Sequence, residues 1–376
     1  MPEKHGDSKE LLKYAVAQTK QRRYATAQAF WVFAFENFVR EEHEKTGKSQ
    51  YIYEENGKRR NKTTCERIKD LPQSSKKDIL FDLNKNIRNK IVHVSFLNED
   101  NKINDIMVKL IPIIFEEKDK TLAKLESEVD IEEVTRLALK LGDRKDYKES
   151  QVSGYLRIQE EDFYKSEILE KKVWALKWQI HDLLQKETGL DKLETGLVSE
   201  FNVDSAWIWV PIGHDIKNEN RRVTKAIISV LILRNMQVRV YLDFGTNANP
   251  YREAYYNLLV NGRNFKNKLL ELVKKYNNFK FFNVKSYCLF KDIEPSIIEN
   301  WLKGNIDEYD KIISDWRINL ENESKRRSNI LLFGKEFPAD YFSQEKKIED
   351  FAEDILEVVK ILKPFLDIIE QEVKVG

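Results

Sequence analysis

The chain of 376 residues is poor in cysteine, glycine and proline. Its two cysteines exclude a disulfide scaffold and a cysteine-rich zinc ribbon or finger. Thirteen glycines and eight prolines are few for this length, which favours helices over a loop-rich or all-β fold. No run of 18 apolar residues is present, so no membrane span is expected, and Met1–Lys13 lacks the apolar core of a signal peptide. This composition predicts a cytoplasmic globular protein.

The net charge of +1 conceals an uneven distribution. Residues 1–90 hold 20 Lys and Arg against 13 Asp and Glu, whereas residues 91–150 hold 10 against 14. An excess of positive charge favours the binding of a phosphate-bearing partner, although a helical surface exposed to solvent can have the same excess of Lys and Arg. Within it, the basic run Lys58, Arg59, Arg60 and Lys62 follows an Asn-Gly turn signal, which predicts an exposed loop or small hairpin.

Apolar residues at helical spacing predict a small helical bundle over residues 1–142. The expected helices cover residues 8–44, 75–94, 103–128 with an interruption near Pro112, and 131–141. Residues 143–159 are charged and aperiodic, so they are interpreted as a linker.

Residues 160–376 are expected to form a mixed α+β domain. Its expected role is in sensing, recruitment or restraint of the first domain's activity. Alternating or β-branched runs predict strands at residues 206–210, 237–244, 279–290 and 330–333. Helices are predicted at residues 160–186, 220–234, 251–259, 266–276, 295–319 and 344–373. The fold class predicted for the whole chain is therefore α+β, with an all-α N-terminal part.

The most informative motif is Arg88-Asn89-Lys90-Ile91-Val92-His93, late in the second expected helix. Arg88 and His93 are five residues apart, about 140° around a helix, so both can flank one groove. An imidazole there can take the proton of an RNA 2′-hydroxyl, and a guanidinium can stabilise the negative charge of a phosphorane. Asn89 can orient either group. This chemistry needs no metal, and no HExxH or CxxC spacing is present.

This motif, within a helical N-terminal third, resembles the R-polar-x3-H signature of HEPN domains, an all-helical nuclease superfamily. The resemblance implies a metal-independent endoribonuclease without a cofactor, of the kind found among toxins and antiviral effectors. It maps the catalytic residues onto Arg88, Asn89 and His93, with Glu36 as the candidate for an acidic residue in an earlier helix. It also implies a homodimer with a composite cleft, and an antitoxin or other regulatory partner.

RNA is the expected partner, and Lys58, Arg59, Arg60, Lys62 and Lys90 are the expected RNA-binding residues.

Two other functions fit the sequence. An inactive bundle would bind RNA or a partner protein without cleaving it. A metal-dependent nuclease would use carboxylates at strand ends in the second domain, with Asp243 as a ligand at the end of one strand; Glu200 and Asp204 flank another strand.

Overall fold

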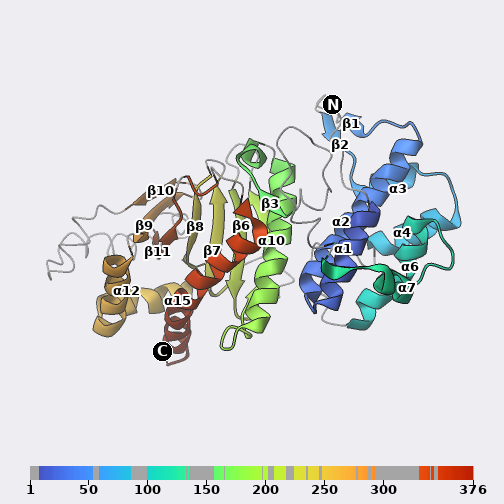
Figure 1. Cartoon of the computed structure of the whole chain (residues 1–376). Helices are drawn as coiled ribbons and strands as arrows, with labels where there is room; N and C mark the ends of the chain where they lie inside the picture. Colours follow the sequence, from blue (N-terminus) through green and yellow to red (C-terminus); the bar gives the residue numbers. More distant parts are fainter. Residues whose placement is uncertain are drawn as a thin grey trace. The chain divides into compact units, whose positions relative to one another are not determined.

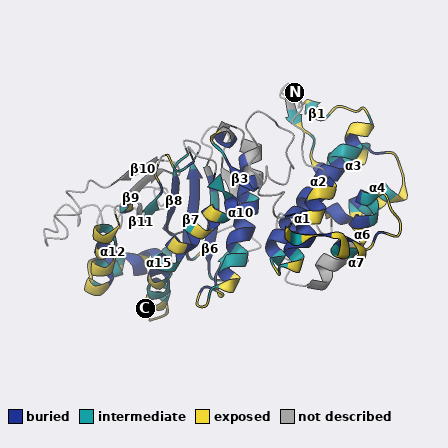
Figure 2. Cartoon of the chain, in the orientation of Figure 1, coloured by how far each residue is buried: buried dark blue, intermediate teal, exposed yellow. Residues whose placement is uncertain are grey.

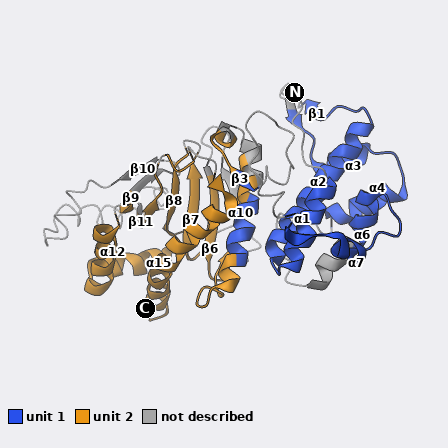
Figure 3. Ribbon diagram, in the orientation of Figure 1, with its two compact units in different colours: residues 1–157, 174–182 blue, residues 158–173, 183–376 orange. Residues whose placement is uncertain are grey.

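The protein is described by a computed structural model that covers two compact units (Figure 3). One unit comprises residues 1–157 with residues 174–182, and the other comprises residues 158–173 with residues 183–376. The predicted α+β class is confirmed: helices lead, and an antiparallel sheet with helices follows. The structure describes residues 8–53, 59–85, 100–132, 134, 156–164, 166–196, 198–201, 207–216, 224–233, 236–244, 248–276, 278–286, 289–292, 330–338, 340–342 and 346–375.

The first unit is built from helices and one short hairpin (Figure 1). Its elements are α1 (Ser8–Lys20), α2 (Tyr24–Lys45), β1 (Tyr51–Tyr53), β2 (Arg59–Asn61), α3 (Thr64–Asp70), α4 (Ser75–Leu83), α6 (Asp100–Phe115), α7 (Leu122–Glu128) and the middle of α10 (Ser166–Lys186).

The single helix predicted over residues 8–44 is wrong, because the structure divides it into α1 and α2. Arg22 interrupts it with a left-handed φ of 59°. The first residue of α2 has no local cap; instead Asp182 of α10 accepts the backbone N–H groups of Ala25 (3.2 Å) and Thr26 (2.9 Å). A carboxylate at that place satisfies two of the unpaired amides at the helix start and stabilises the positive end of its dipole.

Helix α2 contributes most of its residues to the buried core of the first unit (Figure 2). Its residues are buried on nearly every side, as expected for a helix surrounded by others. Phe30 contacts Tyr14 of α1, with ring centroids 4.4 Å apart. Gly47, with a φ of 68°, follows the end of α2, where a left-handed residue commonly ends a helix.

Two other helix predictions need correction. The short helix α3 is absent from the predicted set, although Thr63 and Glu66 form a complete capping box at its start. The chain expected as one helix over residues 103–128 forms α6 and α7, and the break follows Phe115 rather than Pro112. Glu116 turns the chain there with a φ of 58°.

The second unit is organised around an antiparallel sheet of eight strands. The strand order is β10-β9-β11-β8-β7-β6-β4, and β5 also pairs with β6. The strands are β4 (Glu194–Thr195), β5 (Ser199–Phe201), β6 (Trp207–Gly213), β7 (Ala226–Leu233), β8 (Val238–Phe244), β9 (Phe279–Ser286), β10 (Leu289–Asp292) and β11 (Ile330–Glu336). A separate pair joins β3 (Arg157–Ile158) to β12 (Lys346–Lys347).

The helix predicted over residues 220–234 is wrong, because Ala226–Leu233 is the strand β7. It pairs with β6 on one side and β8 on the other, and Ala226–Ile232 is fully buried. A continuous apolar run rich in β-branched residues is typical of a strand covered on both faces. Likewise, the strand expected over residues 279–290 is the hairpin of β9 and β10.

Helices pack together against this sheet (Figure 1). Helix α15 (Ile348–Val375) contacts β7 and β8, α11 (Asn249–Val260) contacts α15 and β8, and α12 (Arg263–Lys275) contacts α11 and β9. A 3-10 helix (Glu160–Tyr164) precedes α10. The helix predicted over residues 295–319 lies outside the described residues. Among the described helices, none is long and apolar enough to span a bilayer.

Candidate functional site

The predicted catalytic motif follows α4. Ser74 caps this helix by accepting the Lys77 N–H (3.2 Å), and Leu80 and Leu83 are buried as the apolar spacing predicts. Helical backbone continues through Asn84 and Lys85 as a wider π-type turn. Arg88, Asn89, Lys90 and His93 lie outside the described residues, as does Lys58.

Glu36, the acidic residue that the resemblance adds to the motif, lies in the middle of α2. Its side chain is half-buried, between the buried residues Phe35 and Asn37. It is thus carried by a helix whose other residues are mostly buried, while its own side chain keeps partial exposure to solvent.

The predicted basic hairpin is present, and it carries two exposed tyrosines. Strands β1 and β2 pair antiparallel, with Tyr51 opposite Asn61 and Tyr53 opposite Arg59. Tyr51 is 40% exposed and Tyr53 72% exposed, and both lie on the same face of β1 because side chains alternate along a strand. The hairpin therefore presents two aromatic rings to solvent.

Arg60, on β2, is held by a carboxylate of α3. Its guanidinium donates two hydrogen bonds of 2.8 Å to Glu66, and the same carboxylate accepts the Thr63 N–H at the start of the helix. Arg60 and the Thr63 amide together lower the pKa of Glu66 to about 2. This bidentate pair fixes the hairpin on α3.

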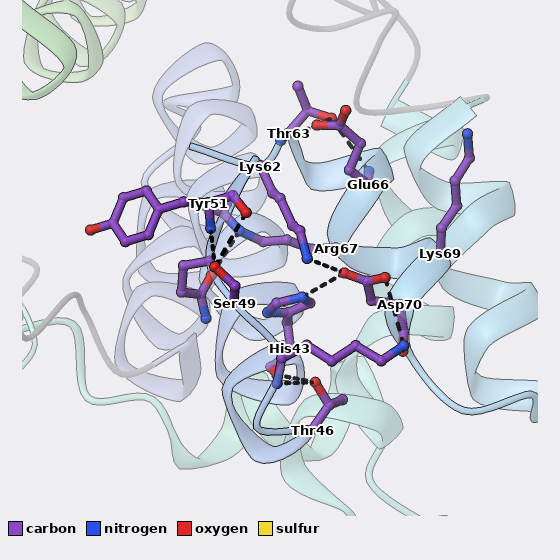
Figure 4. A network of polar contacts seen from close by, with 12 residues as sticks. His43, Thr46, Ser49, Tyr51, Lys62, Thr63, Glu66, Arg67, Lys69 and Asp70 are labelled. Carbon is purple, nitrogen blue, oxygen red and sulfur yellow. Dashed lines mark hydrogen bonds and ion pairs between the residues drawn. The ribbon is translucent and has the colours of Figure 1, made fainter. Parts of the chain in front are cut away.

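Lys62 joins a second network, one turn further along α3 (Figure 4). Its ammonium lies 2.5 Å from Asp70 Oδ2, and Nε2 of His43 lies 2.9 Å from the same oxygen. Lys48 donates to the Asp70 backbone carbonyl (2.8 Å). Hydrogen bonds from Lys62 and His43 lower the pKa of Asp70 to about 2. No sequence pattern pairs His43 with Asp70, because the two residues lie on different helices.

These contacts limit the chemistry of the hairpin. The His43 side chain is fully buried, so it cannot reach a substrate and serves to connect α2 with α3. Arg60 and Lys62, both predicted to bind RNA, each face a carboxylate within the protein, which reduces the positive potential that they project. Only the backbone of Arg59, the third predicted cation of the hairpin, is described.

Asp243, the alternative metal ligand, ends β8 in a chain of hydrogen bonds. Trp209 Nε1 donates to Ser229 Oγ (2.6 Å), and Ser229 donates to Asp243 Oδ2 (2.6 Å). The Phe244 N–H donates to the other oxygen (2.7 Å), and burial raises the pKa of Asp243. These bonds tie three neighbouring strands together. Asp243 is not among the described carboxylates and histidines that converge on one point, and Asp204 lies outside the described residues.

One group of described residues does converge in that way, namely His214, Asp367 and Glu370 in the second unit. The sequence did not reveal this cluster, because the histidine follows β6 and both carboxylates lie on α15, far along the chain.

Comparison of the chain with protein-family models, with curated proteins and with solved structures gave no match.

Proposed function

We propose that this protein is a metal-independent endoribonuclease. The observation that carries the proposal is the Arg88-Asn89-x3-His93 motif, which resembles the HEPN signature and follows a capped amphipathic helix in a helical N-terminal unit. The resemblance also assigns Glu36, which lies on α2 of the same unit, and the exposed tyrosines of the hairpin add support for contact with RNA.

In the proposed reaction, His93 takes the proton of an RNA 2′-hydroxyl. The 2′-oxygen bonds to the adjacent phosphorus, and the bond from phosphorus to the 5′-oxygen breaks. The leaving oxygen takes up a proton, which gives a 2′,3′-cyclic phosphate and a 5′-hydroxyl end. Arg88 stabilises the negative charge of the phosphorane with its planar pair of donors, and Asn89 orients the imidazole or the phosphate.

By the same resemblance, the active form is a homodimer, and the biological role is that of a cytoplasmic toxin or phage-defence effector under the control of an antitoxin or another partner. The role rests on family analogy alone.

The decisive experiment is cleavage of a mixed RNA pool in EDTA, with the product ends mapped. Wild type is expected to cleave and to leave cyclic-phosphate ends. His93→Ala is expected to lose activity by at least about 100-fold, as is usual for a general acid or base, and Arg88→Ala by a similar factor, as is usual for a group that stabilises transition-state charge. Arg263→Ala is a matched control, because it removes an exposed guanidinium from the second unit. Circular dichroism of each variant establishes that it is folded.

Full cleavage by both motif variants would refute the assignment. Binding of RNA by the wild type without any cleavage would instead support a second candidate, an inactive bundle that binds RNA. Tyr51 and Tyr53 favour RNA contact in either case, because exposed aromatic rings stack on unpaired bases.

A further inference from the structure

A histidine and two carboxylates meet where the end of β6 faces α15. His214 comes directly after β6, and Asp367 and Glu370 lie three residues apart on α15, which places them on the same side of the helix. Nε2 of His214 lies 3.5 Å from Asp367 Oδ1 and 3.8 Å from Glu370 Oε2. The three ligand atoms all lie within 4.8 Å of one another.

These separations suit a single metal ion. Zinc binds imidazole nitrogen and carboxylate oxygen at about 2.0–2.2 Å, so two ligands of a tetrahedral ion lie roughly 3.3 Å apart. Contraction of the observed triangle, whose sides are at most 4.8 Å, to this separation would bring all three atoms to bonding distance. Both residue types are common zinc ligands, and three protein ligands leave a fourth position for water.

The surrounding residues orient the cluster. Lys363 donates to Asp367 Oδ2 (2.6 Å), which leaves Oδ1 directed at His214. A hydrogen bond of this kind to a ligating carboxylate is a usual feature of metal sites. The other oxygen of Glu370, Oε1, is buried and has no hydrogen-bond partner among the described residues.

The charges around the cluster are mixed. Lys225 and Lys374 act on Glu370 from nearby, and Lys225 is paired with the exposed Asp215 (2.9 Å). Tyr251, at the start of α11, lies near enough to be influenced by the charges of Lys225, Glu370 and Asp215. Asp367 and Glu370 place two negative charges on one side of α15, so a cation between them would reduce their mutual repulsion.

We propose that His214, Asp367 and Glu370 bind one divalent cation of the zinc class and thereby connect the end of β6 to α15. Such an ion would neutralise the two adjacent carboxylates and accept the lone pair of the neutral imidazole. This site is separate from the proposed ribonuclease motif, and its test does not involve RNA.

The experiment is a titration of the full-length chain, treated with EDTA and then dialysed free of it, with Zn²⁺ by calorimetry. The melting temperature is measured with and without the ion. Wild type is expected to bind one Zn²⁺ per chain at this site and to melt at a higher temperature in its presence. Glu370→Gln and His214→Ala are expected to weaken that binding by roughly 100-fold and to abolish the increase in melting temperature.

Glu372→Gln provides the matched control, because it removes an exposed carboxylate from the same helix, two residues away. It is expected to bind Zn²⁺ as the wild type does. Glu370→Gln keeps the size of the side chain, so the test remains valid if His214→Ala perturbs folding. Replacement of zinc by Co²⁺ adds a visible absorption spectrum that depends on imidazole and carboxylate ligation.

Absence of Zn²⁺ binding by the wild type at 100 μM would overturn the proposal. Binding of equal affinity in wild type and Glu370→Gln would overturn it too, because the ion would then occupy another site. In both cases the cluster would be a set of polar contacts between His214 and the two carboxylates that holds no metal.

Discussion

Lys177 is a buried cation whose removal should stabilise the protein. It lies in the part of α10 that belongs to the first unit and is only 1% exposed. Burial lowers its pKa from the usual 10.5 to about 7. Its ammonium lies 4.1 Å from the ring centre of Trp178 and 5.0 Å from that of Trp174. Within the described part of the chain it makes no ion pair with a carboxylate.

The cost of the buried charge follows from this pKa. Each tenfold change in proton affinity corresponds to about 1.4 kcal/mol, so a fall of the pKa from 10.5 to about 7 represents about 5 kcal/mol of desolvation at neutral pH. The cation–π contacts recover about 2 kcal/mol. Desolvation is the larger effect, and about 3 kcal/mol remains against the folded state. Replacement by Met, which has a similar unbranched shape, should therefore increase the free energy of unfolding by about 3 kcal/mol at pH 6.5.

The stability gained by Lys177→Met should fall as the pH rises. Between pH 7 and pH 10.5 the unfolded chain keeps a proton on Lys177 that the folded chain has lost, so the stability of the wild type rises with pH. In Lys177→Met that contribution is absent. The advantage of the variant should shrink to about 1.4 kcal/mol at pH 9.5, one pH unit below the unfolded pKa of 10.5.

The assay is urea denaturation at pH 6.5 and pH 9.5, followed by tryptophan fluorescence. Lys186→Met, which removes an exposed lysine from the same helix, should leave stability nearly unchanged at both pH values. If Lys177→Met destabilises the protein equally at the two pH values, the ammonium is not desolvated and the reasoning is wrong.

Three further outcomes are expected. Asp70→Asn should lower the stability of the first unit above pH 4 and make that stability less sensitive to acid. The folded pKa of Asp70, about 2, is below its unfolded value, so its contribution to stability is lost as the pH falls from about 4 to 2. Acid titration of wild type and variant, followed by far-ultraviolet circular dichroism, checks this. Gly334→Ala should lower the free energy of unfolding by about 3 kcal/mol or more, measured by urea denaturation, since its Cβ would lie 2.2 Å from the Val240 carbonyl oxygen in the adjacent strand. Tyr53→Ala should reduce the affinity for single-stranded RNA about tenfold without loss of thermal stability, whereas the control Tyr276→Ala should bind as the wild type does; equal binding by both would exclude stacking on the hairpin.

The elements that could be predicted from the sequence are those specified by local pattern. Residues 237–244 alternate strictly between apolar and polar side chains, and they form β8. The Asn-Gly turn signal predicts an exposed loop or a small hairpin, and the structure has the two paired strands of a hairpin there. The helix predicted to begin at residue 75 does begin there, as α4, and Ser74 caps it. In each case the residues that determine the structure lie within a few positions of one another.

The errors arise where contacts distant in sequence decide the structure. The break between α1 and α2 is stabilised by Asp182, a residue 157 positions from Ala25. The run Ala226–Leu233 has no helical or alternating pattern of its own, and its place between β6 and β8 makes it a strand. In the sequence, Arg60 and Lys62 count as two positive charges of the predicted RNA-binding residues. In the structure each pairs with a carboxylate of α3, a helix that was not predicted. For the same reason, the convergence of His214 with Asp367 and Glu370 could not be predicted.

The two proposals respond differently to the same reagent, and this keeps them separable. EDTA removes Zn²⁺, so it should lower the melting temperature of the second unit while RNA cleavage continues, because the chemistry assigned to Arg88 and His93 requires no metal. Cleavage that stops in EDTA and returns with Zn²⁺ would contradict the metal-free mechanism. His214→Ala would then decide whether the converging residues of the second unit supply the metal: loss of the zinc-restored cleavage would assign the reaction to them, and its persistence would place the metal elsewhere in the chain.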